Sequence, residues 1–311
     1  MDKLKKMIKN FIQITDHLVD LIALILILSM MSLSGYMLWD SNQIYEKADA
    51  KIYEPYMPTR NHSKSFKELQ QINNDVIGWL KVNNTHINYP LVQCENDDKY
   101  MNTDVEGNYS LSGSIFLHAE NNPHFTDFNN IIYGHHMVKH MMFGDIGEFT
   151  NQNFFNKHHY GNLYYDGINH GIEFIAIMQL DAYNERAFNV CISEEAKQEY
   201  IKLIDSNSLY KRNVQISPND HLVILTTCTS DMTNGRNVLV GKITNKTYPE
   251  KIKKNKGIGI DILNNNTYLE LILILIALII AVFVKKRKNR YSRTFSRRIY
   301  TTRLHGSCGK K

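Results

Sequence analysis

The feature that most constrains this chain is an uncharged run close to its N-terminus. Residues 21–39 (LIALILILSMMSLSGYMLW) are 19 consecutive residues without a charged side chain. About 20 apolar residues in an α-helix are enough to cross the hydrocarbon core of a bilayer. The lysines of the preceding MDKLKKMIKN favour the cytoplasmic side of a membrane. We therefore expect a transmembrane signal anchor over residues 18–39, with residues 1–17 in the cytoplasm. A cleaved signal peptide is the alternative, but the run is long for one and no A-x-A-like cleavage site follows it.

A second apolar run lies near the C-terminus. Residues 271–284 (LILILIALIIAVFV) give 14 uncharged residues, a length that also suits a buried core helix. Two apolar residues before Glu270 extend the run, and the lysines after it suit a membrane surface. We expect a second transmembrane helix over residues 268–284. Residues 285–311 carry eleven Lys or Arg and no acidic residue, so this tail is expected in the cytoplasm with the N-terminus. The part between the two spans is then expected outside the cell, anchored in the cell membrane.

The polypeptide between the spans is long enough for one domain of ordinary size. We divide it into a stalk (40–64), a folded domain (65–247) and a linker (248–267). Residues 18–284 contain 21 Lys or Arg and 29 Asp or Glu, a net charge of −8. This excess of acid argues against a nucleic acid as the partner of the folded part, whereas the basic flanks favour membrane lipid.

The folded part is rich in short segments that are typical of β-strands. They are β-branched or aromatic and are bounded by Asn, Gly or Asp. The predicted strands cover residues 86–93, 113–119, 129–136, 162–167, 172–183, 221–228 and 237–244. A helix is predicted from Ser193 (SEEAKQEYIKLIDSN), because a serine N-cap precedes acidic residues and an apolar face. Residues 65–72 also show helical spacing. Many short strands with few helices indicate a mainly β fold, a closed or nearly closed barrel.

The chain has four cysteines, which differ in their surroundings. Cys308 belongs to the predicted cytoplasmic tail, so an odd number remains outside and at least one is free or paired with another chain. Cys94 and Cys191 are interpreted as small buried apolar residues, with a bridge between them as an alternative. Cys228 stands where the apolar LVIL turns polar, at a strand end that opens onto a surface. No CxxC spacing occurs, which disfavours a zinc ribbon.

Cys228, His135 and Arg236 together predict an acyl-transfer site. The thiolate is the nucleophile, and a nearby cation favours this form. His135 follows an apolar strand and a glycine, where its imidazole can hold a proton and return it to a leaving amine. Arg236 opens the strand after Cys228, close enough for its guanidinium to neutralise an oxyanion beside the thiol. A buried cysteine with a solvated arginine is the alternative.

The histidines raise a metal site as another alternative. The chain has 13, several of them clustered at residues 135–140 and 158–159. Imidazoles bind zinc and related ions, but acidic ligands at a fixed spacing are missing from these clusters and no HExxH-type helix occurs. We therefore expect no metal site in this chain.

These residues resemble the motifs of the sortases. ILTTC at residues 224–228 is similar to the sortase TLxTC motif, and the arginine-bearing RNVLVGKI follows it. IIYGHHM at residues 131–137 resembles the sortase histidine motif in its class B form. The upstream segments VIGWLKVNNTHINYPLVQ and YSLSGSIFLHAENN also resemble class B sequences. The similarity covers roughly residues 65–245, and the helix from Ser193 lies where class B sortases carry an inserted helix.

The resemblance implies a sortase-type closed β-barrel of about eight strands and a two-step transpeptidation without metal or organic cofactor. Cys228 would be the nucleophile, His135 the catalytic histidine, and Arg236 the oxyanion and substrate arginine. Thr226 and Thr227 would contact the substrate. Such an enzyme cleaves the C-terminal sorting signal of secreted surface proteins or pilins through a thioester. An amine of cell-wall peptidoglycan or a pilin lysine then resolves that thioester.

The sequence departs from the class B pattern in three places. Ile224 replaces the usual threonine, and His118 stands after SIFL where the class often has aspartate, so no role of that acid is implied. A second membrane span is typical of the pilus-building class C, yet no class C lid with its Asp-Pro-Trp-like plug precedes the barrel. The alternative function is a catalytically inactive, membrane-tethered sortase-like binding or sensory module. The intact cysteine, histidine and arginine favour the enzyme.

Overall fold

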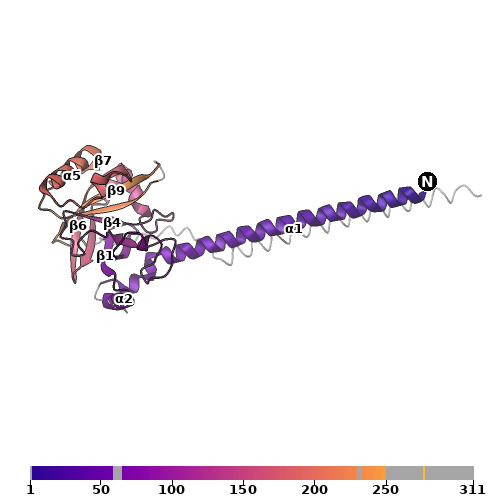
Figure 1. Cartoon of the computed structure of the whole chain (residues 1–311), viewed down its shortest axis with the longest axis horizontal. Coiled ribbons are helices and arrows are strands. Elements are labelled where there is room, and N and C mark those ends of the chain that lie inside the picture. Colours follow the sequence, from indigo (N-terminus) through magenta and orange to yellow (C-terminus); the bar gives the residue numbers. More distant parts are fainter. Residues whose placement is uncertain (1, 59–64, 230–232, 250–275, 277–311) are drawn as a thin grey trace, which may run out of the picture. The chain divides into compact units, whose positions relative to one another are not determined.

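The structure of the chain is a computed structural model that describes residues 2–58, 65–229 and 233–249, together with Ile276 (Figure 1). The predicted second transmembrane helix (268–284) lies outside the described residues, apart from Ile276. The basic tail after it also lies outside them.

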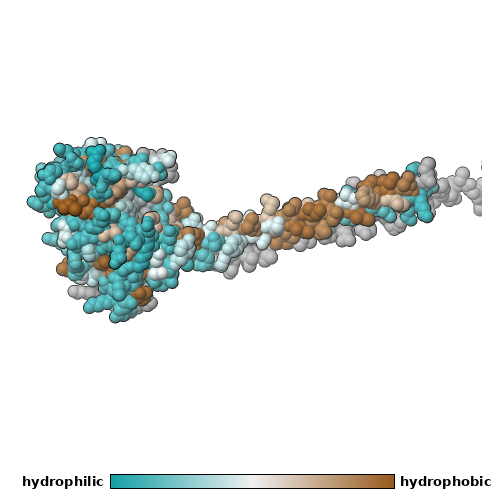
Figure 2. Space-filling model, viewed as in Figure 1, coloured by the Kyte–Doolittle hydropathy of each residue, from teal (hydrophilic) through white to brown (hydrophobic). Residues whose placement is uncertain are grey.

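A long N-terminal helix, α1 (Asp2–Ala48), contains the whole uncharged run of residues 21–39. Its apolar side chains are exposed, and they form the brown stretch along the helix in Figure 2. A contiguous exposed apolar surface of this size is unfavourable in water. Among the described helices, α1 is the one long and apolar enough to cross a membrane, so it is a candidate membrane span.

A closed β-barrel forms the folded domain. Its strands are β1 (Val76–Val82), β2 (Asn88–Val92), β3 (Ile115–Leu117), β4 (Asn129–Tyr133), β5 (Tyr160–Tyr165), β6 (Ile168–Asp181), β8 (Leu222–Cys228) and β9 (Gly235–Thr244). The hydrogen-bonded order is β5-β1-β2-β3-β4-β8-β9-β6, and β5 also pairs with β6, which closes a ring of eight strands. The short β7 (Ser208–Lys211) pairs with β6 outside the ring. The predicted mainly β barrel is confirmed.

Two pairings in the barrel are parallel, and they determine where chemistry can occur. β2 pairs with β3 and β4 pairs with β8 in parallel, whereas the other neighbours are antiparallel. Parallel neighbours end at the same edge of a sheet. The carboxyl ends of β4 and β8 therefore open at one rim of the barrel, and β9 starts at the same rim because it runs antiparallel to β8.

Short helices cover parts of the barrel. They are α2 (Phe66–Ile72), α3 (Gln152–Lys157), α4 (Glu185–Phe188) and α5 (Glu194–Asn207), with the 3-10 turns η1 (Ala50–Ile52), η2 (Glu54–Tyr56), η3 (Lys99–Met101) and η4 (Gly144–Thr150). The predicted helix after Ser193 is confirmed as α5. The Ser193 side chain accepts a hydrogen bond from the backbone N–H of Ala196, as expected of an N-cap.

Strand β8 is buried on both faces, which explains its continuous apolar run. Val223 and Leu225 pack in a cluster to which all eight barrel strands contribute, whereas Leu222 and Ile224 pack in a second cluster with α5. Fully burying such a side chain stabilises the fold by about 1.5–3 kcal/mol. Cys228 is the first exposed residue of the strand, so a firmly held segment presents it at the rim.

Part of the predicted stalk packs against the domain. Ala48, Tyr53 and Tyr56 are buried in the larger apolar cluster, and the Tyr89 hydroxyl donates a 2.8 Å hydrogen bond to the Ala48 carbonyl. The residues directly after α1 are therefore attached to the barrel rather than extended as a free connection.

Candidate active site

The thiol and the guanidinium lie directly opposite each other on paired strands. Cys228 at the end of β8 is the register partner of Arg236 on β9. The Nη1 atom of Arg236 donates a hydrogen bond to the Cys228 sulfur. The Thr229 N–H donates to the Gly235 carbonyl at 3.0 Å, which continues the pairing past Cys228. Arg236 thus places a hydrogen-bond donor and a positive charge next to the sulfur.

The parallel partner of β8 brings His135 to the same rim. Tyr133 of β4 pairs with Thr226, and the next N–H, that of Gly134, donates to the Thr226 carbonyl at 3.3 Å. From the pair of Tyr133 and Thr226, each of the two segments continues by the same number of residues, one to His135 and the other to Cys228. Neighbouring strands lie about 4.8 Å apart. Cys228 and Arg236 thus belong to β8 and β9, and His135 follows shortly after the end of β4, the other neighbour of β8 in the ring.

The contact of the His135 ring selects its tautomer. The Nε2 atom lies 2.8 Å from the carbonyl oxygen of Met101, at the end of η3. A carbonyl only accepts, so Nε2 carries the proton in this arrangement. Nδ1 of a neutral imidazole is then the nitrogen that can accept a proton. The orientation of the half-buried His135 ring thus depends on a backbone oxygen that is distant in the sequence.

The loop that follows His135 is held in an unusual backbone conformation. Lys139, His140 and Met142 have φ values of 60°, 61° and 51°, in the left-handed region that non-glycine residues rarely adopt. The Phe143 N–H donates to the His135 carbonyl at 3.0 Å, and the Met142 N–H donates to the Tyr89 hydroxyl at 2.9 Å. Such a conformation persists only where surrounding contacts determine it.

The two threonines before the nucleophile lie beneath the surface. Thr226 and Thr227 are 1% and 2% exposed, and neither Oγ1 atom has a hydrogen-bond partner among the described residues. A buried hydroxyl without a partner is costly, which marks this segment as unusual for a core strand. Their role in substrate binding stays a prediction.

A carboxylate near the site was not anticipated from the sequence. Asp97 Oδ2 lies 2.5 Å from Nδ1 of His118, and the His118 ring packs edge-on against Tyr133 of β4 with centroids 5.9 Å apart. Burial raises the pKa of Tyr133, and the charge of Asp97 adds to the rise, whereas Arg236 opposes it. Tyr133 is therefore a neutral phenol beside the site. His118, which stands where class B sortases often have aspartate, is thus paired with an aspartate 21 residues away in the sequence.

The remaining described cysteines are separate free thiols. Cys94 is half-buried and Cys191 is buried, and neither forms a bridge in this structure. Burial raises the pKa of Cys191 to about 11, which keeps it protonated. Among the described cysteines, Cys228 alone is exposed, so it is the one suited to act as a nucleophile.

Comparisons with known proteins find chains of similar sequence and fold. A scan against family models gives no match. Sortase B of Listeria monocytogenes serovar 1/2a is 31% identical over 185 residues, which are 58% of this chain and 74% of that relative. The solved sortase B from the type II pilus of Streptococcus pneumoniae is 40% identical with a TM-score of 0.52, over 59% of this chain and 100% of that one. A Staphylococcus aureus sortase B–substrate complex is 25% identical with a TM-score of 0.54, over 58% and 85%.

The similarity covers most of the length of each of these proteins, and the fold agrees with it. A closed barrel is present, and its β4, β8 and β9 bring histidine, cysteine and arginine to one rim. Because 74% of the Listeria relative is matched at 31% identity, this chain belongs to the sortase B family, whose members are cysteine transpeptidases.

Proposed function

We propose that the chain is a membrane-anchored sortase in which Cys228, His135 and Arg236 carry the reaction. The observation that supports this most is the pairing at the barrel rim. An exposed cysteine ends a buried strand, and a guanidinium from the next strand donates to its sulfur. A positive charge at that place lies beside the nucleophilic sulfur and would later face the oxyanion of the attacked carbonyl.

The proposed reaction proceeds in two acyl transfers. The Cys228 sulfur attacks a carbonyl carbon within the sorting signal, and the carbonyl oxygen becomes an oxyanion next to Arg236. The protonated His135 gives its Nδ1 proton to the leaving amine, the C–N bond breaks, and a thioester remains on Cys228. An acceptor amine then attacks the thioester and gives a proton to His135. A new C–N bond forms, the C–S bond breaks, and the thiolate returns.

The substrates are proposed from the similar proteins. One of them is a substrate complex of sortase B, and another is the sortase of a type II pilus. We propose that the donor is a secreted surface protein or pilin with a C-terminal sorting signal. The acceptor is an amine of peptidoglycan or a pilin lysine, and the pilus relative favours the lysine.

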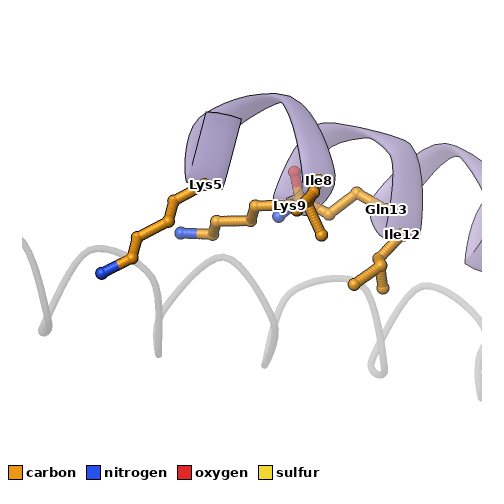
Figure 3. A pocket seen from close by; sticks show the side chains of 5 residues that line it. All are labelled: Lys5, Ile8, Lys9, Ile12 and Gln13. Carbon is orange, nitrogen blue, oxygen red and sulfur yellow. The ribbon is translucent and has the colours of Figure 1, made fainter. Parts of the chain in front are cut away.

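The N-terminal helix supports anchoring in a membrane. Figure 3 shows Lys5 and Lys9 extending from α1 beside Ile8 and Ile12, which with Gln13 line a shallow pocket on the helix surface. Such lysines keep their apolar stems on the helix and place their ammonium groups at the membrane surface. Because lysines favour the cytoplasmic side, we propose that the N-terminus is cytoplasmic and the barrel is extracellular. The second span and a cytoplasmic C-terminus remain part of this proposal.

The test uses the full chain in detergent micelles and a panel of fluorogenic sorting-signal peptides. Wild type and Cys228→Ala are compared for cleavage, and mass spectrometry reports the acyl adduct. We expect cleavage and a thioester on Cys228 in the wild type, with neither in the variant. A folded wild-type chain that forms no adduct with any peptide would instead favour an inactive binding module.

A further inference from the structure

A compact group of two histidines and one aspartate lies outside the residues that carry the proposed reaction. His86 follows β1 in the turn to β2, His140 lies in the loop after His135, and Asp145 lies in η4. The Nδ1 atom of His86 is 2.9 Å from Oδ2 of Asp145, and the Nδ1 atom of His140 is 2.5 Å from Oδ1. Each residue offers one ligand atom, and these atoms lie within 4.8 Å of one another.

The aspartate of this group is fixed, whereas the histidines are accessible. The Asp145 side chain is 3% exposed, and the backbone N–H of His86 donates to its Oδ2 atom at 2.7 Å. The side chains of His86 and His140 are 68% and 52% exposed. Their rings stack with centroids 5.0 Å apart and planes inclined by 22°. An ion from solution can therefore reach the two imidazoles, and a positioned carboxylate lies behind them.

The donor set has the chemistry of a transition-metal site. Two imidazole nitrogens and one carboxylate oxygen suit Zn²⁺ and similar ions better than Mg²⁺ or Ca²⁺, which prefer oxygen alone. Zinc lies about 2.0–2.2 Å from such atoms, so tetrahedral ligands are about 3.3 Å apart. The distances from the two Nδ1 atoms to the Asp145 oxygens, 2.9 and 2.5 Å, are those of hydrogen bonds. Small rotations of the exposed imidazole rings would lengthen them to the distance between two ligands of one zinc ion. The bound ion would then replace the two Nδ1 protons that the imidazole rings donate to the Asp145 carboxylate.

We propose that His86, His140 and Asp145 bind one divalent transition-metal ion of the Zn²⁺ type, with water in the remaining position. This inference rests on the geometry of the three residues and does not depend on the proposed transpeptidation. Its consequence concerns the loop that begins at His135. A metal ion joins that loop to the turn after β1, and so restricts the left-handed segment around His140. The ion would act as a positioning element for His135, without contact with the substrate.

A hydrogen-bonded clamp without metal is the competing explanation. Asp145 already accepts hydrogen bonds from both rings and from one backbone N–H. Such a clamp needs N–H groups that donate to Asp145. A metal site instead needs imidazole nitrogens whose lone pairs can bind the ion. His140→Gln separates the two, because an amide N–H₂ still donates to Asp145 but replaces a strong zinc ligand.

The experiment measures Zn²⁺ binding to the untagged full chain in detergent by isothermal titration calorimetry. The parent is Cys228→Ala, which removes the exposed thiol as a competing zinc ligand. His86→Ala and His140→Gln are compared with the matched control His124→Ala. His124 also pairs with an aspartate, Asp166 at 2.7 Å, but no second imidazole joins that pair among the described residues. We expect one Zn²⁺ site in the parent and the control, weakened at least tenfold by His86→Ala and by His140→Gln.

Thermal unfolding provides a second readout that separates binding from folding. We expect His140→Gln to unfold near the parent temperature without metal, and Zn²⁺ to raise the midpoint of the parent and of His124→Ala but not that of His140→Gln. Co²⁺ should give visible absorption bands that depend on His86 and His140. Equal zinc affinity in all four proteins, or an equal rise in midpoint, would overturn the proposal and leave the hydrogen-bonded clamp.

Discussion

The two halves of the candidate active site are built by different means. Cys228 and Arg236 face each other in the register of paired strands, and the segment before Cys228 is buried on both sides. His135 instead lies beyond the end of β4, and its ring is directed by the carbonyl of Met101, 34 residues away. The thiol half is therefore fixed by the barrel, whereas the imidazole half is fixed by loop contacts.

This difference indicates where the site is stiff and where it can adjust. Register is fixed where the two faces of a strand pack in different apolar clusters, because a slip by one residue would move each side chain into the wrong cluster. Loops with left-handed non-glycine residues cost about 1–2 kcal/mol for each such residue and depend on external contacts. We infer that the position of His135 responds to changes in its loop, whereas Cys228 and Arg236 stay in place. Substitutions in the two halves should therefore differ in what they change.

Removal of the nucleophile should have the largest effect and should leave the fold intact. Cys228→Ala removes the sulfur from the exposed end of β8, where a methyl group fits. We expect loss of peptide cleavage by on the order of 10⁴-fold or more. The checks are kcat/KM, the absence of a thioester in mass spectra, and an unchanged unfolding midpoint. Cys94→Ala is the control and should keep full activity. Peptide cleavage by Cys228→Ala, or a thioester on one of its other cysteines, would contradict the assignment.

Removal of the guanidinium should be the next largest effect. Arg236→Ala deletes the donor to the sulfur and the charge that faces the oxyanion, and we expect kcat/KM to fall by about 10²–10³-fold. Arg236→Lys keeps the charge but not the planar fork, so it should recover only part of the loss. Lys242→Ala, on the same strand and paired with Asp220 at 2.8 Å, serves as the control. An effect of Arg236→Ala no larger than that of Lys242→Ala would exclude a catalytic role.

A change in the loop should disturb the imidazole half alone. At Gly144 an added Cβ would lie 2.3 Å from the carbonyl oxygen of Met137, a backbone atom that cannot move aside without distorting the loop. We expect Gly144→Ala to lower the free energy of unfolding by about 1–3 kcal/mol and to lower kcat. Gly147→Ala is the matched control, because its Cβ would meet nothing closer than 3.6 Å.

The rate at which iodoacetamide alkylates Cys228 tests the contrast in the same variants. Alkylation at high pH, where the thiolate forms without help from histidine, should be unchanged by Gly144→Ala if the thiol half is independent of the loop. A large change in that rate, with kcat unaffected, would reverse the assignment of the stiff and adjustable halves.

The thiol half could be predicted from the sequence because it depends on local pattern. The apolar LVIL run predicts a buried strand, and a gap of eight residues from Cys228 to Arg236 predicts a hairpin that pairs them. The barrel was predicted from the same kind of local pattern, namely short β-branched or aromatic segments bounded by Asn, Gly or Asp. Strand β1 was missed because Gly78 interrupts its run. Gly78 is required where β1 pairs with β5, because a Cβ at this position would lie 2.5 Å from the Tyr164 carbonyl oxygen.

The imidazole half could be predicted only in part, because its supports come from distant segments. His135 was recognised from its place after a strand, but its partner Met101 belongs to a short 3-10 turn without a sequence signal. Asp97 was missed for the same reason. The short strand β7 was also missed, since Ser208 follows α5 without a Gly or Pro to mark the boundary. Long-range contacts of single side chains have no periodicity by which a sequence reveals them.

The smallest predicted effect concerns the support of β4 and depends on pH. The hydrogen bond to Asp97 raises the pKa of His118, and partial burial opposes the rise. The native state therefore holds the proton more tightly than the unfolded chain. The charged pair contributes fully below the unfolded pKa of about 6.5, and this contribution is lost as the pH rises through the higher native value. Its size should be on the order of 1 kcal/mol, as expected of a charge-assisted hydrogen bond.

Asp97→Asn tests this pair, with unfolding free energies measured by urea from about pH 5.5 to pH 9, where carboxylates stay ionised. The deficit of the variant should be largest at the acidic end and should shrink as the pH rises, because only the protonated His118 gains from the carboxylate charge. The exposed pair of His124 and Asp166 is the control, since solvent screens it and Asp166→Asn should change the unfolding free energy little. A deficit of Asp97→Asn that grows with pH would mean that the neutral imidazole is the native form. Tyr133 would then lie against an uncharged ring, and the support of the strand that leads to His135 would be packing rather than charge.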